Sequence, residues 1–317
     1  MNTFTEPYFQ NENAARAKIE SVRWPNGPVC GRCGEGARRY ATKRPGRFRC
    51  GNPACRKDYT VTTGTVMESS HIPLHKWLMA FYLLSASKKG MSSLQLMRSL
   101  GVTYKSAWFL SHRVREAMKA GGLAPPMGGE GNIVEADETY HGKRETQVAR
   151  SRNARKTFTK RGLGGGAQKR IIVSLVERGG SVRSFHVASA DRFTLGKIVR
   201  ENVAKESRLH TDENNIYVEV GKEFVSHETV IHSHKEYVRD DVHVNSAEGF
   251  FGLFKRGFNG IYQHCREKHL HRYLAEYDFR YNHRQNLGFN DLARTLSAVK
   301  GAEGKRLTYR KANSAIV

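Results

Sequence analysis

Residues 132–141 read NIVEADETYH, and this stretch decides how the second half of the chain folds. Ile133 and Val134 begin a short β-type run, and Asp137 follows them where that strand ends. The preceding segment, GGLAPPMGGEGN at residues 121–132, is rich in Gly and Pro and breaks the helical pattern before it. The stretch therefore predicts the first strand of a new domain, with a carboxylate at the end of that strand.

Further β-type runs follow this strand, and one helix interrupts them. The order is three strands, a helix and two more strands, followed by a helix from Ser246. The five runs are NIVEADETY, RIIVSLVER, SVRSFHVAS, RLHTDEN and ETVIHSH, and the interrupting helix is DRFTLGKIVRENVAKE. This order predicts a mixed α/β fold with an RNase H-like core.

Two further acids occupy comparable places in this half of the chain. Asp212 ends the fourth strand, and Glu248 lies 36 residues later on a helix. The first and fourth strands are neighbours in an RNase H-like core, so Asp137 and Asp212 are expected at one edge of the sheet. Two like charges ~4 Å apart repel by about 4 kcal/mol at an effective dielectric of 20. Because carboxylates ligate hard divalent cations, the three acids predict a site for two Mg²⁺ or Mn²⁺ ions.

Three other polar residues accompany Glu248 on its helix. Lys255 follows it by seven residues, about two turns, and so lies on the same helical face, where it is expected to hold a phosphate oxygen. Arg256 extends this positive strip toward DNA. Asn245 lies one turn before Glu248 and supplies a neutral oxygen ligand, a phosphate contact or a helix cap. His232 and His234 are interpreted as ordinary polar histidines.

Composition points to a nucleic-acid partner. The chain of 317 residues carries 53 Lys and Arg against 30 Asp and Glu, a formal net charge of +23. A field of one sign and this size favours binding to a polyanion. No apolar run approaches the ~18 residues of a membrane span, and the polar N-terminus has no secretory signal. We therefore expect a cytoplasmic protein without a membrane partner.

Four of the five cysteines have the spacing of a zinc ribbon. Cys30 and Cys33 enclose two residues, Cys50 and Cys55 enclose four, and sixteen residues separate the pairs. Two such knuckles place four thiolates tetrahedrally around a structural Zn²⁺. The alternatives are four ordinary thiols or two disulfides. Cys265 has no partner at this spacing and is expected to be an incidental thiol.

Residues 92–119 have a helix-turn-helix pattern, with Gly101 in the turn. The start of the second helix would meet base edges or phosphates. Lys105 and Ser106 are the predicted DNA contacts there, with Arg113 further along the helix. The alternative is a helical hairpin that serves only packing.

These patterns divide the chain into four parts. The predicted parts are an N-terminal helix with the zinc ribbon (1–68), a helix-turn-helix domain (69–122), an RNase H-like catalytic domain (130–290) and a polar C-terminal tail (291–317). Residues 144–170 carry nine Lys and Arg against one acid. This segment is either a solvated loop or a mobile arm that closes on DNA phosphates.

The chain resembles the zinc-ribbon DDE transposases of bacterial insertion sequences, the ISXO-like group. The matching stretches are the ribbon with the helices after it, VEADETYHGKR, TDE and VNSAEGFFGLFKRGFNGIYQHCREKHLHRYLAEYDFRYNHR. The resemblance implies an RNase H-like domain that uses Mg²⁺, with Asp137, Asp212 and Glu248 as its acidic triad. Related enzymes also use an Asn in the third catalytic region, which leaves Asn245 as a competitor or helper to Glu248. It also implies binding to terminal inverted repeats and target DNA, in a homo-oligomeric synaptic complex on the bacterial nucleoid.

The expected function is DNA transposition. Water would first attack a phosphodiester at the element end, and the released 3′-OH would then attack target DNA. Two alternatives are a non-catalytic DNA-binding regulator and an RNase H-type nuclease that hydrolyses without joining. The regulator reading leaves the three ordered acids without a purpose, and a strand-transfer assay separates the nuclease.

Overall fold

The protein is described here from a computed structural model that covers residues 3–121, 124–145, 158–159, 162–163, 169–234 and 236–308. The chain forms two compact units. Unit 1 consists of Met1–Ala120 together with His283–Val317, and unit 2 consists of Gly121–Asn282. The first junction falls in the Gly- and Pro-rich segment at 121–132. Within the described residues no helix has the length and apolar character needed to cross a bilayer.

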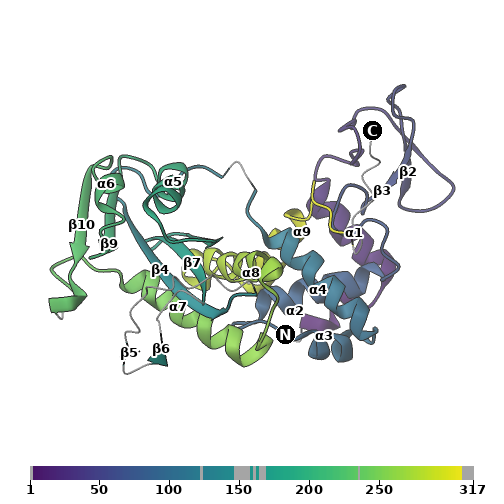
Figure 1. The fold of residues 1–317 in the computed structure, drawn as a ribbon. Coiled ribbons are helices and arrows are strands. Elements are labelled where there is room, and N and C mark those ends of the chain that lie inside the picture. Colours follow the sequence, from purple (N-terminus) through teal and green to yellow (C-terminus); the bar gives the residue numbers. More distant parts are fainter. Residues whose placement is uncertain are drawn as a thin grey trace, which may run out of the picture. The chain divides into compact units, whose positions relative to one another are not determined.

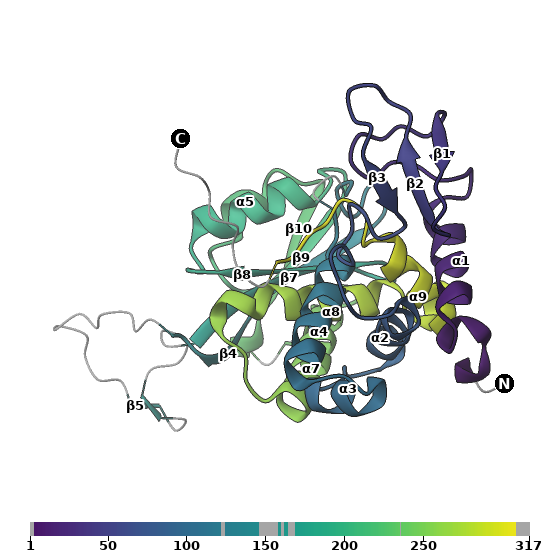
Figure 2. The ribbon, with the colours of Figure 1, turned by 90° about the vertical axis from the view of Figure 1, so that its right-hand side faces the viewer.

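Unit 1 joins a small three-stranded sheet to a group of helices (Figures 1 and 2). Its helices are α1 (Glu12–Arg23), α2 (Leu74–Ala86), α3 (Ser93–Leu100), α4 (Tyr104–Met118) and α9 (Asp291–Lys300), with 3-10 turns at Thr3–Thr5, Pro7–Phe9 and Gln285–Leu287. Its antiparallel strands are β1 (Arg39–Ala41), β2 (Arg47–Cys50) and β3 (Asp58–Thr60). The apolar helix α2 packs against the other four helices, which explains why Trp77 and Phe81 are fully buried.

The helix pair α3–α4 has the geometry that its sequence predicts. Gly101 ends α3 with a φ of +58°, a left-handed conformation that glycine adopts without strain. Thr103 caps α4 by accepting a hydrogen bond from the Ser106 N–H, at 3.3 Å. Leu96 and Leu100 are buried beneath the turn.

The C-terminal segment corrects the expectation of a polar tail over 291–317. Residues 291–300 form α9, which packs against α1, α2 and α4. Its side chain Thr295 and its apolar residues Ala298 and Val299 are buried. The segment that follows α9 pairs with the end of the ribbon, because Val66 N–H donates to Ala302 O and Glu303 forms a bridge with Thr65. At least residues 291–304 are therefore part of unit 1.

Unit 2 is built on a five-stranded sheet in the order β10-β9-β4-β7-β8. The strands are β4 (Ile133–Lys143), β7 (Lys169–Glu177), β8 (Val182–Val187), β9 (Arg208–Asp212) and β10 (Ser226–Val230). β7 pairs antiparallel with both β4 and β8, whereas β9 pairs in parallel with β4, and β10 pairs in parallel with β9. This arrangement confirms the mixed α/β prediction. A separate short hairpin consists of β5 (Phe158–Thr159) and β6 (Gly162–Leu163). Most of the basic segment 144–170 lies outside the described residues.

Helices cover both faces of this sheet (Figure 1). They are α5 (Arg192–Asn202), α6 (Val218–Gly221), α7 (Asn245–Gly257) and α8 (Leu270–Asn282). Short 3-10 helices lie at His232–His234 and Glu267–His269, and a short π-helix lies at Phe258–Tyr262. Alternate residues of β7 face opposite ways, so that Val173 joins the core under α5 while Ile172 joins the core under α7 and α8. The sheet is thus buried on both faces.

Candidate functional site

Asp137 and Asp212 lie at corresponding positions of two neighbouring parallel strands. Ala136 of β4 is the register partner of Thr211 of β9, so the next residues on the two strands are the two aspartates. Residues paired in this way project from the same face of a sheet. The structure therefore brings these two predicted site residues together. Asp212 ends β9 as predicted, whereas β4 continues to Lys143, so Asp137 lies within its strand and not at its end.

The electrostatics of Asp137 show which acids surround it. Burial raises the pKa of Asp137 to about 8, and the neighbouring charge of Asp212 adds to this increase. Glu138 and Glu248 raise it further. Burial also raises the pKa of Asp212. At neutral pH this group of carboxylates must hold protons or cations, because like charges in a desolvated region oppose one another's ionisation.

Glu248 reaches this region from the first turn of α7. Its side chain is 52 % exposed, and its carboxylate lies 3.9 Å from the Nε2 atom of His232. The four cysteines form the one group of described residues whose ligand atoms come within 4.8 Å of one another. The three acids therefore lie in one region of unit 2, but their carboxylate oxygens do not all come within 4.8 Å of one another.

His232, which the sequence analysis interprets as an ordinary polar histidine, lies close to both Asp212 and Glu248. It follows β10, whose Val230 is the register partner of Asp212. The charge of His232 opposes the increase in the pKa of Asp212 that burial causes. Tyr237 lies against its imidazole, with ring centroids 5.3 Å apart. The sequence signal for His232 is its position directly after β10, the strand that pairs with the Asp212 strand.

Glu138 acts on the opposite face of β4. Its carboxylate accepts hydrogen bonds from Asn214 Nδ2, at 2.6 Å, and from the Tyr217 hydroxyl, at 2.8 Å. Both donors lie just after Asp212, whose own Oδ1 accepts from the Asn214 N–H at 3.1 Å. Glu138 therefore holds the segment that follows the second aspartate.

The other predicted residues of α7 lie along one helix. Asn245 is its first residue and is exposed, with its N–H 3.4 Å from His243 Nδ1. Burial lowers the pKa of His141, and the charges of Arg170 and Lys255 lower it further. Lys255 therefore lies near the C-terminal end of β4, away from Glu248. The neighbouring Arg256 is exposed. Helix α7 runs alongside β4, acidic at its start and basic at its end.

The four cysteines of the ribbon meet as predicted. The Sγ atoms of Cys30 and Cys55 are 4.0 Å apart, and those of Cys33 and Cys50 are 3.5 Å apart. A tetrahedron with Zn–S bonds of about 2.3 Å has edges of about 3.8 Å, whereas a disulfide would need about 2.0 Å. All four are free thiols, so this geometry fits a zinc ion and not disulfides.

A close backbone approach joins this cysteine cluster to the rest of unit 1. A Cβ atom on Gly31, between Cys30 and Cys33, would lie 2.3 Å from the carbonyl oxygen of Thr63. Glycine is therefore required in this first knuckle.

The predicted DNA contacts of α4 differ in their exposure to solvent. Lys105 is exposed at the start of the helix, beside Tyr104, which is 51 % exposed. Arg113 is instead buried, and its guanidinium lies 5.2 Å from the ring centroid of Trp77. It donates a hydrogen bond to Glu68 O, and burial lowers its pKa to about 10. This corrects the expectation for Arg113, whose side chain serves packing within unit 1.

A mixed α/β unit with acids at corresponding positions of two adjacent parallel strands, in one chain with a four-cysteine ribbon, defines a class of zinc-ribbon proteins. Two family models match the chain, the transposase zinc-ribbon domain at residues 10–58 and the ISXO2-like transposase domain at residues 128–282. The "Uncharacterized protein in transposable element ISH50" of Halobacterium salinarum is 30 % identical over 260 residues, which cover 78 % of this chain and 83 % of that protein. The chain belongs to the zinc-ribbon transposases of insertion sequences, the ISXO2-like family, and the resemblance found in the sequence is confirmed.

Proposed function

We propose that this transposase cuts and joins DNA at the ends of its insertion sequence, using Asp137, Asp212 and Glu248 to hold two Mg²⁺ or Mn²⁺ ions. The observation that carries the proposal is the placement of the two aspartates on register-paired strands, with the charge of Glu248 acting on Asp137. The strand order β8-β7-β4-β9-β10, antiparallel and then parallel, supports an RNase H-like core.

The residues favour Glu248 over Asn245 as the third acid. The charge of Glu248 acts on Asp137 and raises its pKa. A carboxylate also brings the negative charge that divalent cations prefer. Asn245 remains close enough along α7 to contact a phosphate.

The reaction would proceed as two in-line displacements at phosphorus. Bound divalent ions activate the attacking oxygen and stabilise the leaving oxygen. Water attacks the phosphodiester at the element end, the P–O3′ bond breaks, and a 3′-OH is released. That 3′-OH then attacks a target phosphodiester, forming one P–O bond and breaking another. Lys255 and Arg256 would neutralise the phosphates along α7, and no covalent bond to the protein is needed.

DNA recognition would belong to unit 1. The ribbon and the α3–α4 pair supply the surface for terminal inverted repeats, with Lys105 and Ser106 at the start of α4. Two element ends must be joined to one target, so we also propose a homo-oligomeric complex. The direct test is a strand-transfer assay with pre-cut element ends. Joined products support the proposal, hydrolysis alone indicates a nuclease, and binding without reaction at any Mg²⁺ or Mn²⁺ concentration indicates a regulator.

Cation affinity should increase with pH below about 8. Because the pKa of Asp137 is raised to about 8, the metal-free site holds a proton at neutral pH that a cation must displace. We expect the affinity for Mn²⁺ to rise roughly tenfold per pH unit between pH 6.5 and 7.5, the slope for release of one proton. Calorimetry in buffers of different ionisation enthalpy measures that release. A Mn²⁺ affinity that does not change with pH would contradict the displacement of a proton from Asp137 by the cation.

Replacing Lys105 should weaken DNA binding without affecting catalysis on bound DNA. We expect Lys105→Ala to lower affinity for all sequences alike and to reduce the salt dependence, d log K/d log [salt], by about 1. Fluorescence anisotropy at several salt concentrations measures both quantities. Lys197→Ala is the matched control, since Lys197 is an exposed lysine on α5 of unit 2 with a 73 % exposed side chain. An unchanged salt slope in Lys105→Ala would remove Lys105 from the DNA interface.

A further inference from the structure

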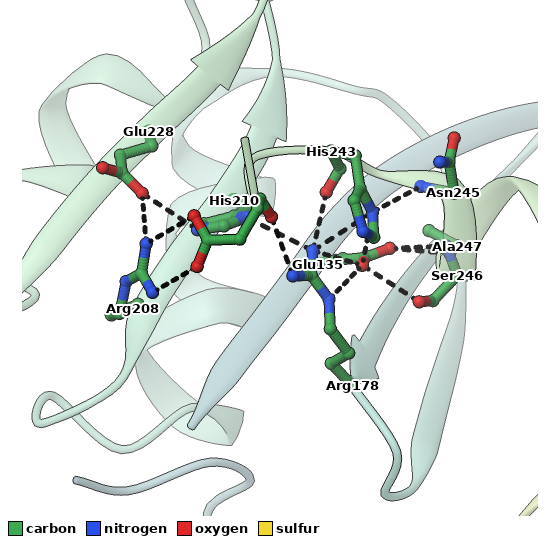
Figure 3. Close-up of polar contacts among 10 residues, drawn as sticks. Glu135, Arg178, Arg208, His210, Glu228, His243, Asn245, Ser246 and Ala247 are labelled. Atoms are coloured by element: carbon green, nitrogen blue, oxygen red, sulfur yellow. Dashed lines mark hydrogen bonds and ion pairs between the residues drawn. The ribbon is translucent and has the colours of Figure 1, made fainter. Parts of the chain in front are cut away.

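Glu135 is a fully buried acid on β4, two residues before Asp137, and it contacts the start of α7. Figure 3 shows its carboxylate facing the first residues of that helix. Oε2 accepts hydrogen bonds from the N–H groups of Ser246, at 2.7 Å, and Ala247, at 3.0 Å. Oε1 accepts from the Ser246 hydroxyl, at 3.0 Å. A side chain of the central strand is therefore attached to the helix that carries Glu248.

These contacts replace a cap that α7 lacks. The residue before the helix is Val244, and α7 has no cap from a side chain at that position. The first N–H groups of a helix need acceptors, and negative charge is favoured at this end of the helix dipole. Glu135 supplies both from the neighbouring strand. Ala247, whose N–H it binds, directly precedes Glu248, so the clamp acts within one residue of the third acid.

Arg178 extends the clamp to the segment that leads into α7. Its Nε and Nη2 atoms donate to Glu135 Oε1 at 3.0 and 2.9 Å. Its Nη1 donates to Asp241 O at 2.8 Å, and its Nη2 also donates to His243 O at 3.2 Å. The buried carboxylate is thus paired with a cation, as its stability requires, and the same cation ties residues 241–243 to the strand.

The hydrogen bonds of Glu135 also exclude a direct role for its carboxylate in binding a metal ion or a substrate. Its two oxygens accept five hydrogen bonds, which is at least the number of lone-pair sites of a carboxylate. Its side chain is wholly inaccessible to solvent. No capacity remains for a metal ion or a substrate, so Glu135 acts through other residues.

We propose that Glu135 is a positioning residue that sets Glu248 at its working distance from Asp137. The inference rests on the proposed function, because it assumes that the two acids share divalent ions. Residues that orient metal ligands typically contribute on the order of 10- to 100-fold in metal affinity or activity. The specific consequence of losing Glu135 should therefore be weaker use of Mg²⁺, with DNA binding unaffected.

The test is the Mg²⁺ dependence of end cleavage by full-length Glu135→Gln. Gln keeps the shape and one acceptor oxygen but loses the charge that pairs with Arg178. We expect the half-saturating Mg²⁺ concentration to rise about tenfold or more, while zinc content and affinity for the inverted repeat stay at wild-type values. Ser246→Ala removes one of the five hydrogen bonds and should shift the Mg²⁺ requirement in the same direction by a smaller factor. If Glu135→Gln does not fold, Ser246→Ala alone tests the inference.

Asp278→Asn is the matched control. Asp278 is likewise a buried carboxylate that joins a helix to a strand, accepting from Ser184 N at 2.8 Å and Ser184 Oγ at 2.6 Å. It links α8 to β8, so its loss should change stability and leave the Mg²⁺ requirement unchanged. A wild-type Mg²⁺ requirement in both Glu135→Gln and Ser246→Ala would overturn the inference. Absence of metal-dependent cleavage in the wild-type protein would contradict the proposed function instead, and Mn²⁺ affinity of the DNA-free variants would then test the clamp.

Discussion

Asp137→Asn is expected to abolish end cleavage and strand transfer while DNA binding stays intact. The amide has nearly the shape of the carboxylate, so β4 and its register with β9 should be preserved. The amide lacks the charge that binds a divalent cation. Without the two metal ions, the attacking and leaving oxygens would lose their stabilisation. We expect a loss of at least about 10³-fold, the order that removal of a principal electrostatic stabiliser produces. Gel assays of cleavage and joining, run beside a binding assay on the same DNA, measure both quantities.

The same variant should be more stable than the wild type when no metal is present. Burial raises the pKa of Asp137 to about 8 from an ordinary value of 3.8, so the folded state binds the proton more tightly than the unfolded state. The wild-type protein therefore loses stability as pH rises from about 4 to about 8, and Asn cannot ionise. The difference in Tm should grow over this pH range in the presence of EDTA. Mg²⁺ should reduce the difference, because cations neutralise the wild-type site.

Two results would contradict this account of Asp137. Full activity in Asp137→Asn would remove it from the catalytic site. A Tm difference that does not change with pH would show that Asp137 is not desolvated beside other acids. Asp212→Asn provides a comparison in the same site, and its stability effect should have the same sign because burial also raises the pKa of Asp212.

The order of strands and the placement of two acids were predictable because they depend on local signals. β-type runs defined the strands, and the pairing of the first and fourth strands placed the two aspartates side by side. The expectation that Asp137 ends its strand was wrong, because β4 continues to Lys143. The helical pattern DRFTLGKIVRENVAKE likewise begins where α5 does, since Asp191 caps that helix by accepting a hydrogen bond from the Thr194 N–H. The cysteine spacing likewise carries its own geometry, so the ribbon ligands could be named without the fold.

The residues missed by sequence reasoning depend on contacts between distant segments. Glu135 resembles any polar residue of a strand until α7, more than a hundred residues later, places its N-terminus against it. Arg113 resembles a surface cation until Trp77 of another helix covers it. Helix α9 was taken for a tail because its short amphipathic pattern is weak without the helices against which it packs. In each case tertiary packing, and not local propensity, determines the role.

Removing zinc is expected to unfold the ribbon and eliminate recognition of the inverted repeat. Strands β1, β2 and β3 have only three or four residues each. Among the apolar contacts of this sheet are the ring contacts that join Trp24, Phe48 and Tyr59. So small a core rarely supplies more than about 3–5 kcal/mol, whereas structural Zn²⁺ contributes roughly 10–16 kcal/mol of binding free energy at pH 7. The metal should therefore supply most of the stability of this sheet.

Cys50→Ser tests this dependence at a buried ligand. We expect loss of the single bound zinc in elemental analysis, loss of near-UV dichroism from the ribbon aromatics, and at least about a hundredfold weaker binding to inverted-repeat DNA, about 2.7 kcal/mol. Cys265→Ser is the control, because Cys265 is a buried cysteine of unit 2 and lies outside the cluster of four. It should keep one zinc per chain and normal DNA affinity. Retention of stoichiometric zinc by Cys50→Ser, or its absence from the wild-type protein, would contradict a four-thiolate site.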